Sequence, residues 1–231
     1  MATTRPSIRV PAAGPEPVRP TGPVERAADL GGQALSVLIN RVYGLGRARP
    51  LHPRGEARAA TWTVEASGLT PTGAPCLDRS GTRHCLVRHS RAVGLPSGWP
   101  DIEGIAVRLE AGADDPGGDI LLAGTGDGFA TRHVLWPRRT DGTCTTLFPL
   151  CSPSGPVLVR LSPSGPDSWR ISWARPGCDW HACGTLALED RPVPPSGPHF
   201  DPVLHAPEGL EHYRTAALLR RPAYVRARRQ A

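Results

Sequence analysis

Alternating apolar and polar residues, the pattern of strands with one buried face, fill the middle of the chain. In the run 60–66, Trp62 and Val64 alternate with Thr61 and Thr63. Gly and Pro, which favour turns, separate this run from others of the same kind. The pattern predicts strands at 60–66, 84–90, 104–110, 119–123, 144–147, 157–162, 168–174 and 184–189.

Short strands joined by turns are typical of a sandwich or of a closed barrel, and closure leaves no exposed sheet edge. We therefore expect an α+β fold: a closed antiparallel β-barrel of about eight strands, with flanking N- and C-terminal helices. Apolar residues at helical spacing predict a short helix at about 33–43, although Gly31-Gly32 weakens the segment before it. The segment 210–229 is also predicted to be helical, with Pro222 tolerated at a helix start or a kink.

The chain is expected to form one domain behind a tail. Residues 1–24 repeat Pro and contain few apolar side chains, so burial cannot offset the entropy of ordering them, and a disordered tail is predicted. Residues 25–231 are enough for one domain with a real core and too few for two comfortable ones.

The basic charge does not point to a nucleic-acid partner. The formal net charge is +6, but all 27 basic residues are Arg, and Ala, Gly and Pro are abundant, which is typical of a GC-rich genome. No nucleic-acid-binding motif accompanies the charge, so no specific nucleic-acid partner is expected. Apolar stretches fall far short of the roughly 18 to 20 residues that span a bilayer, and no secretory signal is present, so we expect a cytoplasmic protein without a membrane span.

The six cysteines are expected to be reduced thiols, because no export signal accompanies them. Cys178, His181 and Cys183 lie close together in the sequence. Three ligands at an unconventional spacing leave a zinc site open, but they favour an ordinary strand, turn and strand.

Five segments carry candidate chemistry. Arg49–Gly55 places a His three residues after an Arg and three before a Gly. Val87–Ser90 has the sequence Val-Arg-His-Ser, and Asp101–Arg108 and Asp119–Leu121 follow it. Near the end, the segment Phe200–Tyr224 opens with Phe-Asp-Pro and closes with Arg-x-x-x-Tyr.

The order and spacing of these segments resemble the haem catalase superfamily, over roughly 45–125 and 199–226. The resemblance implies one haem b and a substrate that is hydrogen peroxide or an organic hydroperoxide. It assigns His52 and Ser90 to catalysis, Arg49, Arg88, Arg220 and Tyr224 to haem binding, and Tyr224 to the iron itself.

These roles agree with the chemistry of the side chains. A positioned His can take a proton from peroxide and return it, and Ser90 could fix the ring of His52 by a hydrogen bond. Arg49 and Arg88 offer forked donors suited to propionates. Arg220 lies one helical turn before Tyr224 and can supply positive charge beside a phenolate ligand.

The chain also departs from the family. Counting from Asp119, the catalase distal Asn falls on Ala123, which has no hydrogen-bond donor. We therefore expect a peroxidase-like enzyme or a weak catalase, and the alternative is a haem-free catalase-like barrel that serves as a binding or scaffold module. Some short chains of this kind are labelled phosphodiesterases, but the sequence shows no histidine–aspartate metal motif for that chemistry.

Overall fold

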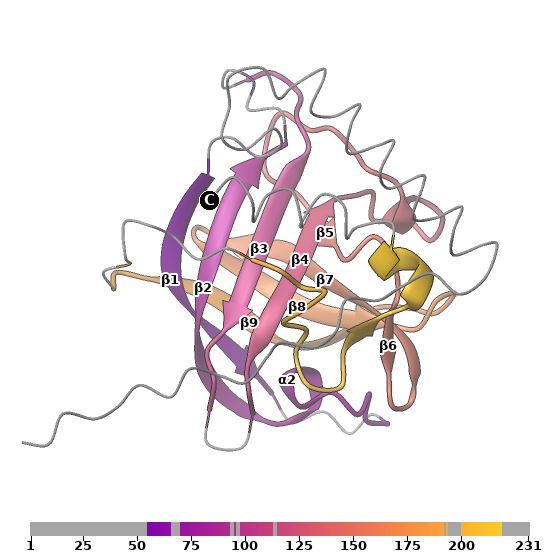
Figure 1. Ribbon diagram of the computed structural model, residues 1–231. Coiled ribbons are helices and arrows are strands. Elements are labelled where there is room, and N and C mark those ends of the chain that lie inside the picture. Colours follow the sequence, from indigo (N-terminus) through magenta and orange to yellow (C-terminus); the bar gives the residue numbers. More distant parts are fainter. Residues whose placement is uncertain are drawn as a thin grey trace, which may run out of the picture.

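The structure, a computed structural model, describes residues 55–65, 70–92, 95, 98–112, 115–191, 193 and 200–218. The described strands, shown in Figure 1, are β1 (Gly55–Val64), β2 (Gly81–Arg91), β3 (Glu103–Leu109), β4 (Gly118–Gly124), β5 (Cys144–Thr145), β6 (Leu150–Ser152), β7 (Gly155–Gly165), β8 (Ser168–Ala174), β9 (His181–Glu189) and β10 (Glu211–His212). Helical turns are formed by α2 (Pro75–Asp78), by η1 (Thr131–His133) and by residues 214–218.

Eight of these strands close into an antiparallel barrel (Figure 1). The order around the ring is β7, β5, β4, β3, β2, β1, β9 and β8, and β8 pairs again with β7. β6 pairs with β7 outside the ring, and β10 pairs with β6. The predicted closed barrel is confirmed, and each of the eight predicted strands overlaps one strand of the ring.

Alternate side chains of each strand fill the interior of the barrel. Trp62, Val87, Ile105 and Ile171 are almost fully buried there, on four different strands. Trp62 also donates its indole N–H to the carbonyl of Cys76, at 2.8 Å. This bond ties α2 to the end of the barrel at which it lies in Figure 1.

The segment after residue 200 crosses the outer face of β4. The Asp119 N–H donates to the carbonyl of His205, and the Asp201 N–H donates to Asp119 Oδ2, each at 2.6 Å. Leu210 is buried beside this contact. The chain therefore comes back onto the first half of the barrel before it ends.

The structure confirms the predicted strands but not the predicted helices. The helix expected at 210–229 is wrong at its start, because residues 211 and 212 form β10 and the described helical turn begins only at Arg214. The rest of that segment, the helix expected at 33–43 and the tail at 1–24 lie outside the described residues. Among the described residues, no helix is long and apolar enough to cross a membrane.

Candidate functional site

Arg88 and Ser90 lie on the outer face of β2. Val87, the residue between Leu86 and Arg88, belongs to the interior cluster, so the side chains of Arg88 and Ser90 point the other way. Ser90 pairs with Gly55 on β1, and its hydroxyl donates to the Gly104 carbonyl at 3.2 Å. The prediction that Arg88 and Ser90 share one face is confirmed.

Gly55 is required by this arrangement. A Cβ atom at Gly55 would lie 2.7 Å from Arg88 Cζ and 2.8 Å from Ser90 Cβ. The Arg88 guanidinium therefore lies directly over the Gly55 backbone. A larger residue at position 55 would displace it.

Small residues continue across the outer faces of the next strands. Ser90 pairs with Gly104 on β3, and Gly104 pairs with Ala123 on β4. In the next row, Arg88 lies between Ala57 and Ala106. We call this surface the small-residue face; its members are Gly55, Ala57, Ser90, Gly104, Ala106 and Ala123.

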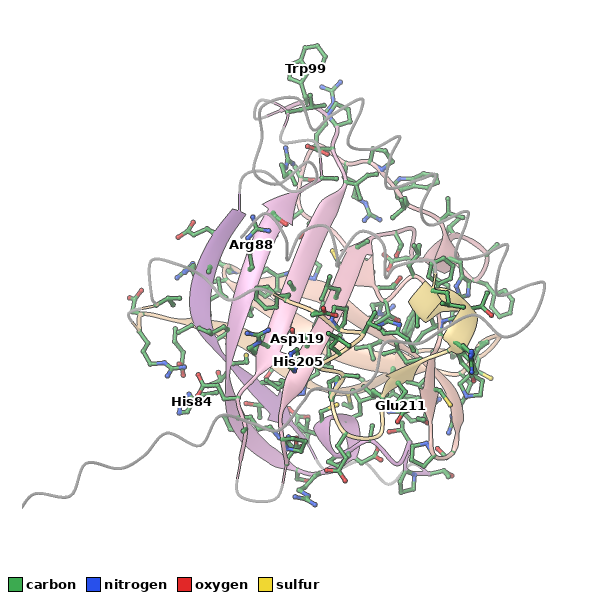
Figure 2. All side chains as sticks on the ribbon, viewed as in Figure 1. His84, Arg88, Trp99, Asp119, His205 and Glu211 are labelled. Atoms are coloured by element: carbon green, nitrogen blue, oxygen red, sulfur yellow. The ribbon has the colours of Figure 1, made fainter. Side chains whose placement is uncertain are left out.

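The small-residue face carries a cation, Arg88, and its central residues Ser90 and Gly104 are buried. Strands lie about 4.8 Å apart, so four of them span about 14 Å. Figure 2 shows Arg88 toward the upper end of β2 and Asp119 lower down on β4, beside His205 of the segment after residue 200. The face therefore combines small side chains with a guanidinium group toward one end.

An ion pair marks the lower border of this face. Arg108 donates from Nε and Nη2 to the two carboxylate oxygens of Asp119, each at 2.7 Å. The hydrogen bond to Asp119 raises the pKa of Arg108 despite its partial burial. The Arg108 guanidinium also lies 5.3 Å from the centre of the Phe200 ring. This pair fixes the segment that precedes Arg220 and Tyr224 in the sequence.

The other predicted site residues lie outside the described residues. These are Arg49, His52, Arg220 and Tyr224. That these four residues lie close to Arg88 and Ser90 therefore stays a prediction.

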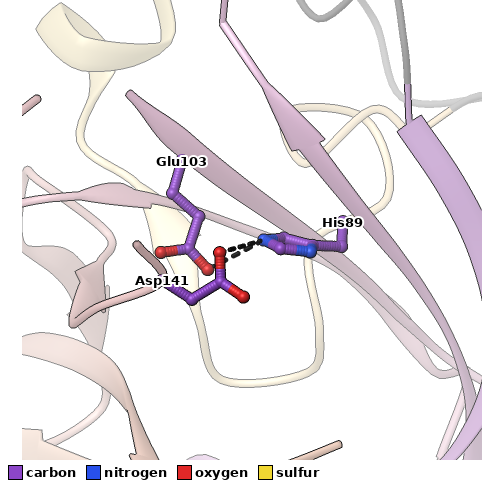
Figure 3. Close-up of side chains that lie close together, drawn as sticks. All are labelled: His89, Glu103 and Asp141. Carbon is purple, nitrogen blue, oxygen red and sulfur yellow. Dashed lines mark hydrogen bonds and ion pairs between the residues drawn. The ribbon is translucent and has the colours of Figure 1, made fainter. Parts of the chain in front are cut away.

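A second group of titratable side chains, His89, Glu103 and Asp141, lies close together at one end of the barrel (Figure 3). His89 Nε2 is 2.9 Å from Glu103 Oε1 and 3.8 Å from Asp141 Oδ1. His89 faces inward, since its ring contacts that of Trp169 across the barrel at 6.5 Å. The hydrogen bond to Glu103, with the charges of Glu103 and Asp141, raises the pKa of His89 against the effect of burial.

The buried carboxylate is held in place by backbone. Only 8% of the Glu103 side chain is exposed, and its Oε2 accepts the Gly142 N–H at 2.8 Å. Asp141 precedes that glycine in the loop and is more than half exposed. The group is therefore partly open to solvent at His89 and Asp141, whereas Glu103 is enclosed.

Sequence reasoning missed this group. Its signal was a polar residue in a core-facing position, because His89 continues the inward series of Cys85 and Val87. Glu103 likewise begins the inward series of β3. Asp141 comes from a loop and offers no periodic signal.

The cysteines match the sequence expectation. All six are free thiols. Cys178 is exposed in a turn, and the Cys183 thiol is buried against the carbonyl of Ile171. Among the described residues, Cys178, His181 and Cys183 form no ligand group, and the strand, turn and strand interpretation is confirmed.

Comparison with protein-family models finds no match for the chain. Comparison with curated protein sequences finds none either.

Proposed function

We propose that this protein binds one haem b on the small-residue face and acts on hydrogen peroxide or an organic hydroperoxide. The observation that carries the proposal is the single row formed by Gly55, Ser90, Gly104 and Ala123 across β1 to β4. The resemblance gives three of these positions a place near the peroxide: Gly55 three residues after His52, Ser90 as the partner of His52, and Ala123 where the distal Asn falls. They come from three segments that are far apart in the sequence.

The described residues fit a haem in two respects. A flat macrocycle needs a wall without large side chains, and the row offers two glycines, a serine and an alanine. Its propionates need cations, and Arg88 provides a forked donor on the same wall. Haem iron would supply the redox chemistry when bound, with Tyr224 as its ligand and Arg220 beside it.

The chain's own residues would manage the proton. His52 would take a proton from the peroxide oxygen and return it to the leaving oxygen. Ser90 already donates its hydroxyl hydrogen to Gly104, so its oxygen can accept an N–H from the His52 ring. That acceptor role would leave the other ring nitrogen free of hydrogen and able to act as the base.

Haem titration followed by the Soret absorption band tests the proposal. Ala106→Phe places a large ring on the small-residue face and should greatly weaken haem binding. Thr82→Phe adds the same ring on the outer face of β2 at its exposed far end and should leave binding unchanged. Equal binding by both variants would contradict the assignment of the face.

The iron ligand needs a separate pair of variants. Tyr224→Phe should abolish or greatly weaken haem retention and change the spectrum. Tyr213→Phe makes the same change at a partly exposed tyrosine of the same terminal region and should not. Unchanged haem content and spectrum in Tyr224→Phe would remove Tyr224 from the site.

Ala123 favours a second candidate function, a haem-free barrel that serves as a binding or scaffold module. The resemblance puts the peroxide-orienting Asn of catalases at this position, and the Ala123 side chain has no donor. Full-length protein that takes up no haem during reconstitution would decide for this alternative.

A further inference from the structure

We propose that His89, Glu103 and Asp141 bind a divalent transition-metal ion at one end of the barrel. Each offers one ligand atom, and the three atoms lie within 4.8 Å of one another (Figure 3). The site is separate from the small-residue face, because His89 and Ser90 leave β2 on opposite sides. The inference therefore does not depend on haem.

The distances require only a small rearrangement. Around a metal with bonds of about 2.1 Å, neighbouring ligand atoms lie about 3.0 to 3.4 Å apart. His89 Nε2 is 2.9 Å from Glu103 and 3.8 Å from Asp141. Asp141, whose side chain is 57% exposed, can move inward by the remaining distance.

The partners of Glu103 orient it toward such an ion. The Gly142 N–H holds Oε2, which leaves Oε1 directed at His89. Hydrogen bonds of this outer kind fix the direction of metal ligands in proteins. Because Gly142 follows Asp141, the same loop also brings the second carboxylate to the imidazole.

Charge also favours a divalent ion. The group holds two carboxylates beside one imidazole, and the buried charge of Glu103 is costly unless it is balanced. A divalent ion on a neutral imidazole would balance both carboxylates. The ion would take the place of the hydrogen bond between His89 and Glu103.

The ligand set selects the class of ion. One imidazole nitrogen with two carboxylate oxygens suits Zn²⁺, Mn²⁺ or Fe²⁺, whereas Ca²⁺ and Mg²⁺ prefer oxygen alone. Three protein ligands leave at least one position for water or another small ligand. The site is thus open in the manner of a catalytic centre rather than closed like a structural one.

Titration of the chelator-treated full chain with Zn²⁺ by calorimetry, and with Mn²⁺ by electron paramagnetic resonance, tests the proposal. We expect one site per chain. Asp141→Asn changes an exposed loop residue and should keep the fold, yet weaken the affinity by about 10- to 100-fold or more, since losing a ligand costs at least as much as losing an outer partner.

His84→Gln is the matched control. His84 lies on the same strand and faces one carboxylate, with its Nδ1 3.6 Å from Glu189, but it faces outward and belongs to no ligand group among the described residues. This variant should bind metal as the natural chain does. If Asp141→Asn retains the natural affinity, or if His84→Gln loses as much as Asp141→Asn, the three residues are an ion-pair group only.

Discussion

Replacing Arg108 by Leu should destabilise the protein far more than removing an ordinary surface arginine. The substitution removes both hydrogen bonds to Asp119, whose side chain is fully buried. Removing one partner of a buried ion pair costs about 3 to 5 kcal/mol, because the other charge stays buried. Asp119 would keep the N–H of Asp201, so we expect the lower end, about 3 kcal/mol.

Equilibrium unfolding in urea, followed by tryptophan fluorescence, measures this loss. For a chain of this size, about 3 kcal/mol corresponds to a fall in Tm of roughly 6 to 12 °C. Adding Asp119→Asn to Arg108→Leu should recover about 1 kcal/mol or more, because a neutral amide removes the uncompensated charge and its oxygen can still accept the Asp201 N–H.

Arg191→Leu is the matched control, because it replaces an arginine by leucine in an exposed ion pair. Arg191 Nη2 lies 3.0 Å from Glu110, but both side chains are more than 40% exposed. Exposed pairs contribute about 0 to 1 kcal/mol, so this variant should unfold nearly as the natural chain does. A loss in Arg108→Leu no larger than that in Arg191→Leu would refute the reasoning.

Three further predictions concern the small-residue face, the thiols and one close approach between strands. Ala123→Asn should raise the rate of dioxygen release from hydrogen peroxide by roughly one to two decades, since a missing hydrogen bond costs about 1 to 3 kcal/mol. An oxygen electrode measures this rate, and an unchanged rate would mean that position 123 does not face the peroxide. Iodoacetamide should modify only Cys151 and Cys178 in the native protein, and all six thiols in guanidinium. The other four thiols are buried, and burial raises the pKa of Cys76, Cys85 and Cys183 to about 12. Rapid modification of four or more thiols in the native protein would contradict the closed core. Gly184→Ala should lower the urea midpoint sharply, because its Cβ would overlap the Thr63 carbonyl oxygen. A natural midpoint would show that the pairing of β1 with β9 is looser than described.

The barrel strands could be predicted because each has one face in the core. Interior residues such as Trp62, Val64 and Ile171 alternate with polar or small ones, and the period of two is visible without any partner strand. The predicted strand at 168–174 has the bounds of β8. β6 and β10 were missed, because two or three residues are too few to establish a period.

The candidate site was predictable only in part. Two residues of one strand, Arg88 and Ser90, had to share a face, and they do. The row that joins Ser90 to Gly104 and Ala123 depends on the register of two hairpins, and a slip of one residue would turn a whole strand over. Composition and periodicity do not fix that register, whereas the packed interior does.

The same dependence on register links the two proposed sites. On β2, His89 faces inward and Ser90 outward; on β3, Glu103 faces inward and Gly104 outward. A slip between these strands would therefore break the ion-pair group and the small-residue row together. Substitutions of single side chains act differently, because they leave the register in place. Asp141→Asn should lose metal binding and keep normal haem uptake, and Ala106→Phe should lose haem and keep normal metal binding. That pattern would show two separate sites. Loss of both ligands in both variants would show that the shared strands, rather than the side chains, had changed.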